Sequence, residues 1–313
     1  MSERISLDSA QPQPVLIVGS VAFDDIITPY ATGERILGGS ASYASLASSF
    51  YAPTQLVGVV GNDFDPKYRQ RLEARGIDLD GLQIDSTGPT FFWKGQYHEN
   101  FNRRDTLDLQ LNVFETFQPE LPERFRQTPF VMLGNIGPGL QMHVVDQLQG
   151  SGHFVVADTI DFWIDAERDA LLEMIRKVDL FTINDDEATK LTGKTNLIDA
   201  GWALRALGPE RAIVKKGEHG AYLFSEEGLF ALPAFPVTEL RDPTGAGDSF
   251  AGALLGYLAA VNRTDVAALK QAMVYATVTA SLTVEAFSCD RLESAGVAEL
   301  AQRRDQLLRM IQV

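Results

Sequence analysis

Short apolar runs alternate along this chain with segments of helical spacing. The apolar runs carry no charged residue and are expected to form buried strands at residues 15–18, 55–59, 130–133, 154–157, 180–183 and 212–214. The spacing elsewhere predicts helices at residues 41–51, 66–75, 140–149, 166–177, 187–191, 197–207, 247–261 and 266–284. This alternation predicts an α/β fold in which helices cover both faces of a mostly parallel sheet, with ligands at the carboxyl ends of the strands.

One region breaks the alternation. Residues 87–117 are rich in aromatic and β-branched side chains, are dotted with charge and have no helical period, so they are expected to form extra strands. The aromatic side chains of this region either face a ligand or a partner chain, or are simply packed inside the protein. Both readings stay open for Phe91, Phe92, Trp93, Tyr97 and Phe101.

The charge of the chain limits its partners. The 313 residues carry a formal net charge of −15, which argues against nucleic acid or an anionic membrane as a partner, because both favour a basic surface. An anionic ligand would therefore need a positive potential that is local. The single cysteine, Cys289, allows no intramolecular disulfide, and a cytoplasmic location fits. Residues 1–13 are polar, contain proline and are expected to form a flexible tail.

The run Asp242-Pro-Thr-Gly-Ala-Gly-Asp248 comes directly before an apolar helical segment. Gly245, Ala246 and Gly247 carry little or no side chain, so their N–H groups can approach an anion closely, and the helix N-terminus adds partial positive charge. Asp248 is expected in the first helical turn, beside the anion. A carboxylate there suits a base that accepts the proton of an attacking hydroxyl in phosphoryl transfer. The alternative is that Asp248 only complements the helix dipole.

The Gly-Ala-Gly-Asp sequence at the start of a late helix resembles the C-terminal signature of the PfkB carbohydrate kinases, the ribokinase-like family. Three further motifs resemble those of the same family and follow in its order, so that the resemblance spans residues 19–252. They are Gly38-Gly39 with the run at residues 57–63, Asn184-Asp-Asp-Glu187, and Lys216-Gly-Glu-His-Gly220.

The resemblance implies a fold and an assembly. It implies one ribokinase-like kinase domain over residues 1–313, a three-layer α/β/α arrangement with a mostly parallel central sheet. Residues 26–37 and 87–117 match in position the small β-sheet lid that these kinases close over the substrate. Because this lid often mediates dimers in the family, a homodimer through the lid is left open.

The resemblance also implies roles on the acceptor side. Asp248 matches the catalytic base, and Gly245, Ala246 and Gly247 match the anion hole. Asp24, at the end of the first strand, matches the substrate-binding aspartate; a carboxylate can accept hydrogen bonds from two vicinal hydroxyls.

The paired glycines Gly38 and Gly39 are implied to lie against the acceptor, and Tyr43 to line its pocket. Tyr43 stands where many members have a sugar-binding asparagine, so the sequence does not favour ribose itself. The run Asp158-Thr-Ile-Asp-Phe-Trp163 lacks the arginine of acid-sugar kinases, which makes a sugar acid a poorer candidate.

On the nucleotide side, the resemblance implies ATP and Mg²⁺. Asn184 and Glu187 resemble the pair that organises Mg²⁺, with Glu187 acting through water. Lys216, Gly217 and Thr244 match nucleotide-binding positions, although the neighbouring Lys215 could equally offset phosphate charge.

A monovalent cation is left open by the sequence. Asp242 and Thr244 match positions where many relatives bind K⁺, but Ser288 replaces a later glycine of that site.

These features predict a kinase that transfers the γ-phosphoryl group of ATP to a hydroxymethyl or hydroxyl group of a small sugar or polyol. A nucleoside kinase on the same fold is the alternative, which Tyr43 and the aromatic lid favour. A catalytically weak ligand-binding relative is disfavoured because Asp248 and the glycines are present. A dinucleotide-binding oxidoreductase is excluded, since the run from Gly19 to Asp24 after the first strand contains no Gly-x-Gly-x-x-Gly.

Overall fold

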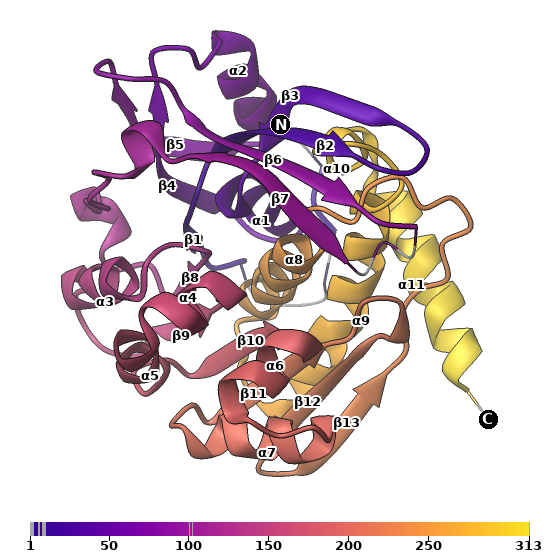
Figure 1. Ribbon diagram of the computed structural model, residues 1–313. Coiled ribbons are helices and arrows are strands. Elements are labelled where there is room, and N and C mark those ends of the chain that lie inside the picture. The colour runs from indigo at the N-terminus through magenta and orange to yellow at the C-terminus, as the bar shows by residue number, and fades with distance from the viewer. Residues whose placement is uncertain (1–2, 6, 8–10, 100, 102, 313) are drawn as a thin grey trace.

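The computed structural model describes residues 3–5, 7, 11–99, 101 and 103–312, which form a large and a small β-sheet with helices around the large one (Figure 1). The large sheet has nine strands within these residues, in the order β13-β12-β11-β10-β9-β8-β1-β4-β5. In chain order they are β1 (Val15–Val18), β4 (Thr54–Gly61), β5 (Ile77–Asp85), β8 (Phe130–Leu133), β9 (Phe154–Ala157), β10 (Leu180–Asn184), β11 (Arg211–Lys215), β12 (Ala221–Ser225) and β13 (Gly228–Leu232).

The strands from β5 to β11 pair in parallel, and β12 and β13 extend the sheet in antiparallel fashion. The predicted α/β fold with a mostly parallel sheet is therefore confirmed. Both faces are buried: Val15 and Ile17 of β1 belong to one apolar layer and Leu16 and Val18 to the other, as the alternation of side chains along a strand requires. Charge-free strands suit this position because neither face meets water.

Helices cover each face of the large sheet. The face of Val15 is covered by α1 (Ser40–Ser49), α2 (Pro66–Ala74), α8 (Ala246–Val261), α9 (Val266–Thr283), α10 (Asp290–Ser294) and α11 (Val297–Ile311). The opposite face is covered by α3 (Pro138–Gln147), α4 (Asp161–Ala166), α5 (Arg168–Ile175), α6 (Asp185–Thr192) and α7 (Leu197–Ala206). Three short 3₁₀ turns are also present in the described residues: η1 (Asn112–Phe114), η2 (Glu123–Phe125) and η3 (Gly217–His219).

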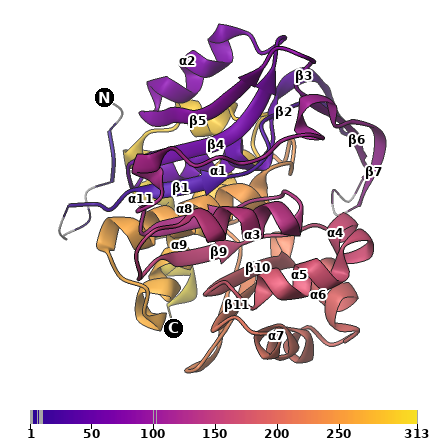
Figure 2. The ribbon, with the colours of Figure 1, turned by 90° about the vertical axis from the view of Figure 1, so that its left-hand side faces the viewer.

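The small sheet has the strand order β3-β2-β6-β7. Its strands are β2 (Ala22–Ile27), β3 (Thr32–Gly38), β6 (Phe91–Tyr97) and β7 (Arg104–Gln110), so the extra strands expected in residues 87–117 are present. Strands β2 and β6 run parallel, although their segments are far apart in the chain. Figure 2 shows this sheet next to α4, which directly follows β9, and so beside the carboxyl ends of the central strands.

The sequence prediction was less complete at the margins of the fold. It missed β5, β12 and β13, which occupy the two edges of the large sheet, and the C-terminal helices α10 and α11. The helix expected at residues 166–177 is present as α5 (Arg168–Ile175), but the short α4 (Asp161–Ala166) before it was missed. The residue between them, Glu167, has φ −136° and ψ 42°, outside the helical region, so one continuous helix is not possible.

The tail expected at residues 1–13 lies partly outside the described residues. Of its described part, Ile5 N–H donates to Phe50 O (2.9 Å) and Gln13 N–H donates to Ala259 O (3.0 Å). The helices in the described part of the chain are all too short or too polar to span a lipid bilayer.

Candidate active site

The loop before α8 has the backbone shape that the glycine-rich sequence predicts. Gly245 is the N-cap of α8 and has φ 76°, in the left-handed region that favours glycine. The buried ring of Tyr43, 1% exposed, lies directly beneath it, and a Cβ on Gly245 would overlap that ring. Backbone conformation and packing therefore both require glycine here. Tyr43, predicted to line the acceptor pocket, lies in this structure beneath the loop.

The three backbone N–H groups expected to form an anion hole differ in their bonding. The N–H of Ala246 donates to Pro243 O (3.2 Å). The N–H groups of Gly245 and Gly247 have no acceptor among the described residues. Both lie at the N-terminus of a long helix, where open N–H groups and the helix dipole favour an anion. The loop thus offers an anion two open donors out of the predicted three.

Asp248 lies in the first turn of α8 and is partly exposed. Loss of surrounding water and, to a smaller extent, the charge of Asp158 raise the pKa of its carboxyl group from 3.8 to about 7, against the opposing charges of Lys215 and Arg104. An ordinary aspartate, with a pKa near ~3.9, would be a weak base at neutral pH. A carboxylate with a pKa near neutrality is far better matched to accept a proton there.

Lys215 is the lysine that the fold brings beneath α8. Its Nζ forms an ion pair with Asp158 Oδ2 (2.6 Å), and the two side chains are 15% and 8% exposed. The same Nζ lies 3.1 Å from the position that a Cβ on Gly247 would occupy. Burial alone would lower the pKa of Lys215, but the charges of Asp158, Glu187 and Asp248 raise it above its usual value, so the lysine stays charged.

Lys216, which the sequence analysis placed in the nucleotide site, lies against an aromatic ring, and its role towards the nucleotide stays a prediction. Its Nζ lies 3.6 Å from the centroid of the Tyr222 ring. Lys216 comes directly after β11 and is the N-cap of η3, so it does not share the strand position that brings Lys215 beneath α8. Gly217 begins the 3₁₀ turn η3 with φ 51° and is exposed.

Asn184 and Glu187 form a capping box at the start of α6. Glu187 N–H donates to Asn184 Oδ1 (2.8 Å), and Asn184 N–H donates to Glu187 Oε2 (3.0 Å). Glu187 is 6% exposed, and burial together with the charge of Asp158 raises the pKa of its carboxyl group to about 7. The Asn-x-x-Glu motif therefore stabilises the helix end, and the role of Glu187 towards Mg²⁺ stays a prediction.

Asp24 lies on β2 and is 4% exposed. Its carboxylate fits against Gly38, where any Cβ would overlap it, and the next residue, Gly39, has φ 90°. No side chain among the described residues donates a hydrogen bond to Asp24. Burial raises the pKa of its carboxyl group well above the usual range, as do the charges of Asp242 and Asp248. Gly38 and Gly39 are thus required by the protein's own packing, and Asp24 is an unpartnered carboxylate facing other site residues.

Asp242 and Thr244 connect the loop to its surroundings. Asp242 is 1% exposed, and its Oδ1 accepts from Thr244 N–H (2.9 Å). The other oxygen, Oδ2, is buried and has no partner in the part of the chain that the structure describes. Burial raises the pKa of this carboxyl group to about 6. Thr244 Oγ1 shares a hydrogen bond with Tyr97 Oη (3.0 Å), which joins the small sheet directly to the loop.

Arg104 is a site residue that the sequence analysis missed. It lies opposite Tyr97 in the β6–β7 pair and hydrogen-bonds that tyrosine. Its positive charge lowers the pKa values of Asp24, Glu187 and Asp248, so it acts on the acceptor and phosphate sides of the site together. Only two consecutive arginines at 103–104 marked this position in the sequence.

Within the described residues, no three His, Cys, Asp or Glu side chains gather as metal ligands. Glu187 and Asp242 therefore remain single-carboxylate candidates, for Mg²⁺ and for a monovalent cation.

Comparison with known proteins places the chain among kinases. Residues 13–295 match the sequence model described as pfkB family carbohydrate kinase. A cytidine kinase from Thermococcus kodakarensis is 29% identical over 262 residues, which are 80% of this chain and 88% of that protein. Fructokinase-2 from Oryza sativa subsp. japonica is 36% identical over 276 residues, 79% of this chain and 80% of that protein.

A solved structure shares the fold. A crystal structure described as ribokinase II from E. coli, in complex with ATP and Mg²⁺, matches with a TM-score of 0.77 at 20% identity, over 94% of this chain and 99% of that one. The relatives are thus kinases named for nucleoside and for sugar substrates.

Proposed function

The chain belongs to the pfkB family of carbohydrate kinases, and on that premise we propose that it transfers the γ-phosphoryl group of ATP to a hydroxymethyl or hydroxyl group of a small sugar, polyol or ribosyl compound. The observation that carries this proposal is Asp248, with a pKa of about 7, beside the open N–H groups of Gly245 and Gly247.

In this mechanism Asp248 accepts the proton of the attacking hydroxyl group. The hydroxyl oxygen then bonds to the γ-phosphorus while the bond from that phosphorus to the β,γ-bridging oxygen breaks, so ADP leaves with the electron pair. The Gly245 and Gly247 amides and the Lys215 ammonium group stabilise the charge on the phosphoryl oxygens. Asp24 accepts hydrogen bonds from vicinal hydroxyls and holds the acceptor in line.

The nucleotide is assigned to Asn184, Lys216, Gly217 and Thr244, and Mg²⁺ to Glu187 through water. Mg²⁺ retains several waters and commonly takes only one or two protein carboxylates, so a site with one buried glutamate fits it. When bound, Mg²⁺ would neutralise charge on the β- and γ-phosphates.

A monovalent cation, K⁺ in our proposal, is assigned to Asp242. The buried Oδ2 atom of this residue has no partner among the described residues, as expected of a carboxylate oxygen that binds a cation. We expect kcat to rise several-fold when K⁺ replaces tetramethylammonium at constant ionic strength, and the Asp242→Asn protein to lose this response. An equal rate in both salts would remove K⁺ from the proposal.

We further propose that residues 1–313 form one kinase domain whose small sheet is a lid that closes over the acceptor and excludes water. The Tyr97–Thr244 hydrogen bond supports this, because it joins lid and loop. The predicted lid bounds, residues 26–37 and 87–117, left out the first part of β2 (Ala22–Ile27), which carries Asp24. A homodimer through the edge strand β7 would cover Leu107 and Leu109, which are 51% and 48% exposed; light scattering measures it. The cytoplasmic location also stays a prediction.

The function is tested by ADP release from ATP and Mg²⁺ across hexoses, pentoses, inositols and nucleosides. We expect a strong acceptor for the wild-type protein and a kcat about 10²- to 10⁴-fold lower for Asp248→Asn, the range typical of a lost general base. ATP binding by the variant, measured by calorimetry, serves as the control for folding. Near wild-type turnover by Asp248→Asn would show that another group is the base.

A further inference from the structure

Trp93 lies on the same face of the small sheet as Asp24. Strands β2 and β6 are parallel and in register, with Asp24 opposite Trp93, and side chains at paired positions point to the same face. The next residue on this face of β6 is Gly95. A Cβ there would overlap the six-membered ring of the Trp93 indole. The indole therefore lies along the strand over Gly95, and the glycine makes room for it.

The indole is held in place yet remains partly exposed. Its Nε1–H donates to Thr106 Oγ1 (3.1 Å) on the neighbouring strand β7. The guanidinium carbon of Arg104 lies 5.7 Å from its ring centroid. Unlike Tyr97, two positions beyond Gly95 and 5% exposed, Trp93 keeps part of its ring surface accessible. An aromatic ring that is held by Thr106 and Arg104 and is still partly exposed suits stacking of a planar group.

The face that carries Trp93 also faces the phosphate loop. Tyr97, on the same face of β6, hydrogen-bonds Thr244 in that loop (3.0 Å). Asp24 brings to this face a buried carboxylate that lacks a donor among the described residues. Neighbouring strands are about 4.8 Å apart and residues two apart on a strand about 7 Å. The indole over Gly95 is thus displaced from Asp24 by about one strand spacing across the sheet and about 7 Å along β6. This separation matches a ligand with two linked rings.

We propose that the acceptor is a nucleoside, whose planar base stacks on Trp93 while Asp24 accepts hydrogen bonds from the vicinal hydroxyls of its ribose. This inference rests on the proposed kinase function and names its substrate class. The pentose satisfies the diol-binding carboxylate, and the base satisfies the aromatic surface beside it. A single sugar ring held by Asp24 would leave the exposed part of the indole, which contacts Thr106 and Arg104 elsewhere, without a ligand contact.

The test compares nucleosides with free ribose, hexoses and disaccharides as acceptors, and then replaces Trp93. Trp93→Ala should raise the KM for the nucleoside about 10- to 100-fold, the range of one lost base–aromatic stack. Trp93→Phe should raise it less. The kcat and the KM for ATP should change by less than about threefold in both variants.

Two substitutions reach the indole without touching the ligand. Gly95→Ala should displace the ring, and Thr106→Val should release its Nε1–H, so both should raise the nucleoside KM. Gln96→Ala is the matched control, because Gln96 is exposed and points from the opposite face of the same strand. A merely structural role for Trp93 would instead lower the melting temperature and change kcat and both KM values together.

Nucleoside binding to Asp248→Asn, measured by calorimetry without ATP, separates this inference from the proposed function. If the protein binds the nucleoside and Trp93→Ala weakens this binding, stacking on Trp93 is supported even when turnover is absent. Phosphorylation of sugars or disaccharides with no nucleoside binding would support the proposed kinase function and reject nucleoside stacking on Trp93. No turnover of any acceptor, together with nucleoside binding, would reject the proposed function alone.

Discussion

Lys215 is surrounded by carboxylates that lie at the ends of different strands and attract its charge. It pairs with Asp158 at the end of β9, and the charges of Glu187 and Asp248 also act on it. In a chain with a net charge of −15, such a buried cation supplies the local positive potential that a nucleotide phosphate needs. It also keeps the proposed base ionised, because it lowers the pKa of Asp248 while Asp158 raises it.

These opposite effects predict opposite shifts of the pH profile. Asp248 is active when ionised, so kcat/KM, which reports the free enzyme, should fall as the pH drops through its pKa of about 7. Lys215→Met should move this limb to higher pH, and Asp158→Asn should move it to lower pH. Lys177→Met, at an exposed ion pair with Asp146, is the control and should leave the profile in place. Shifts of both site variants in the same direction would contradict the assignment.

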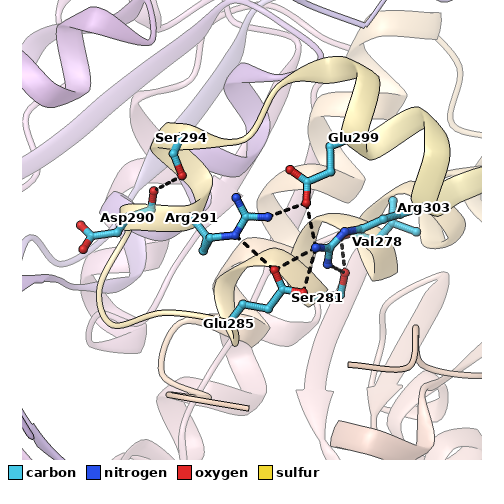
Figure 3. Close-up of polar contacts among 8 residues, drawn as sticks. All are labelled: Val278, Ser281, Glu285, Asp290, Arg291, Ser294, Glu299 and Arg303. Carbon is cyan, nitrogen blue, oxygen red and sulfur yellow. Dashed lines mark hydrogen bonds and ion pairs between the residues drawn. The ribbon is translucent and has the colours of Figure 1, made fainter. Parts of the chain in front are cut away.

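At the scale of elements, the C-terminal helices support the loop that carries the site. Arg241 N–H, just before the loop, donates to Val284 O (2.8 Å) at the end of α9. The next residue, Glu285, accepts from Arg303 of α11 (2.8 Å) and from Arg291 of α10 (3.1 Å), as Figure 3 shows. Arg303 also donates to Ser281 and Glu299. This network fixes the segment against which the loop before α8 lies.

Removing the arginine at its centre should therefore loosen that segment. Arg303 is 12% exposed, and Arg303→Met leaves Glu285 with fewer donors. We expect a loss of about 1–3 kcal/mol of unfolding free energy, the usual cost for a hydrogen-bonded charged group. Thermal unfolding measures it, with Arg309→Met in the exposed last turn of α11 as control. An equal melting temperature for both variants would show that the network adds no stability.

The elements also show what the sequence could and could not predict. Interior strands such as β8 and β9 are apolar on both faces, and their pattern identified them. The edge strand β5 alternates buried with more exposed residues and contains Gly81, so it lacks that pattern. In the site, Asp248 and Asp24 were assigned from their motifs, and their roles stay predictions. Lys215 and Arg104 were not assigned, because their roles come from strand ends and a lid that meet only in the folded chain.

At the scale of the whole molecule, the site concentrates carboxyl groups that resist ionisation. Burial raises the pKa of Asp248 and Glu187 to about 7, that of Asp242 to about 6, and that of Asp24 well above its usual range. Each of these groups binds its proton more tightly in the folded chain than in the unfolded one. The folded state therefore holds extra protons between about pH 4 and pH 7, and their contribution to stability is lost as the pH rises through this window.

The proposed base provides the test of this cost. At pH 8 the folded wild-type protein must keep Asp248 ionised in a site that disfavours the charge, whereas Asp248→Asn carries no charge there. We expect the variant to melt roughly 2–6 °C above the wild type at pH 8, since one pKa unit corresponds to about 1.4 kcal/mol. At pH 5 the carboxyl is protonated in the folded wild type but largely ionised in the unfolded chain, so the difference should shrink to roughly a third, and it should vanish only below about pH 4. Calorimetry at both pH values measures this; a constant difference would mean that the substitution acts through packing, and a loss of stability at pH 8 would mean that the Asp248 charge is stabilised by Lys215 beyond the cost of its burial.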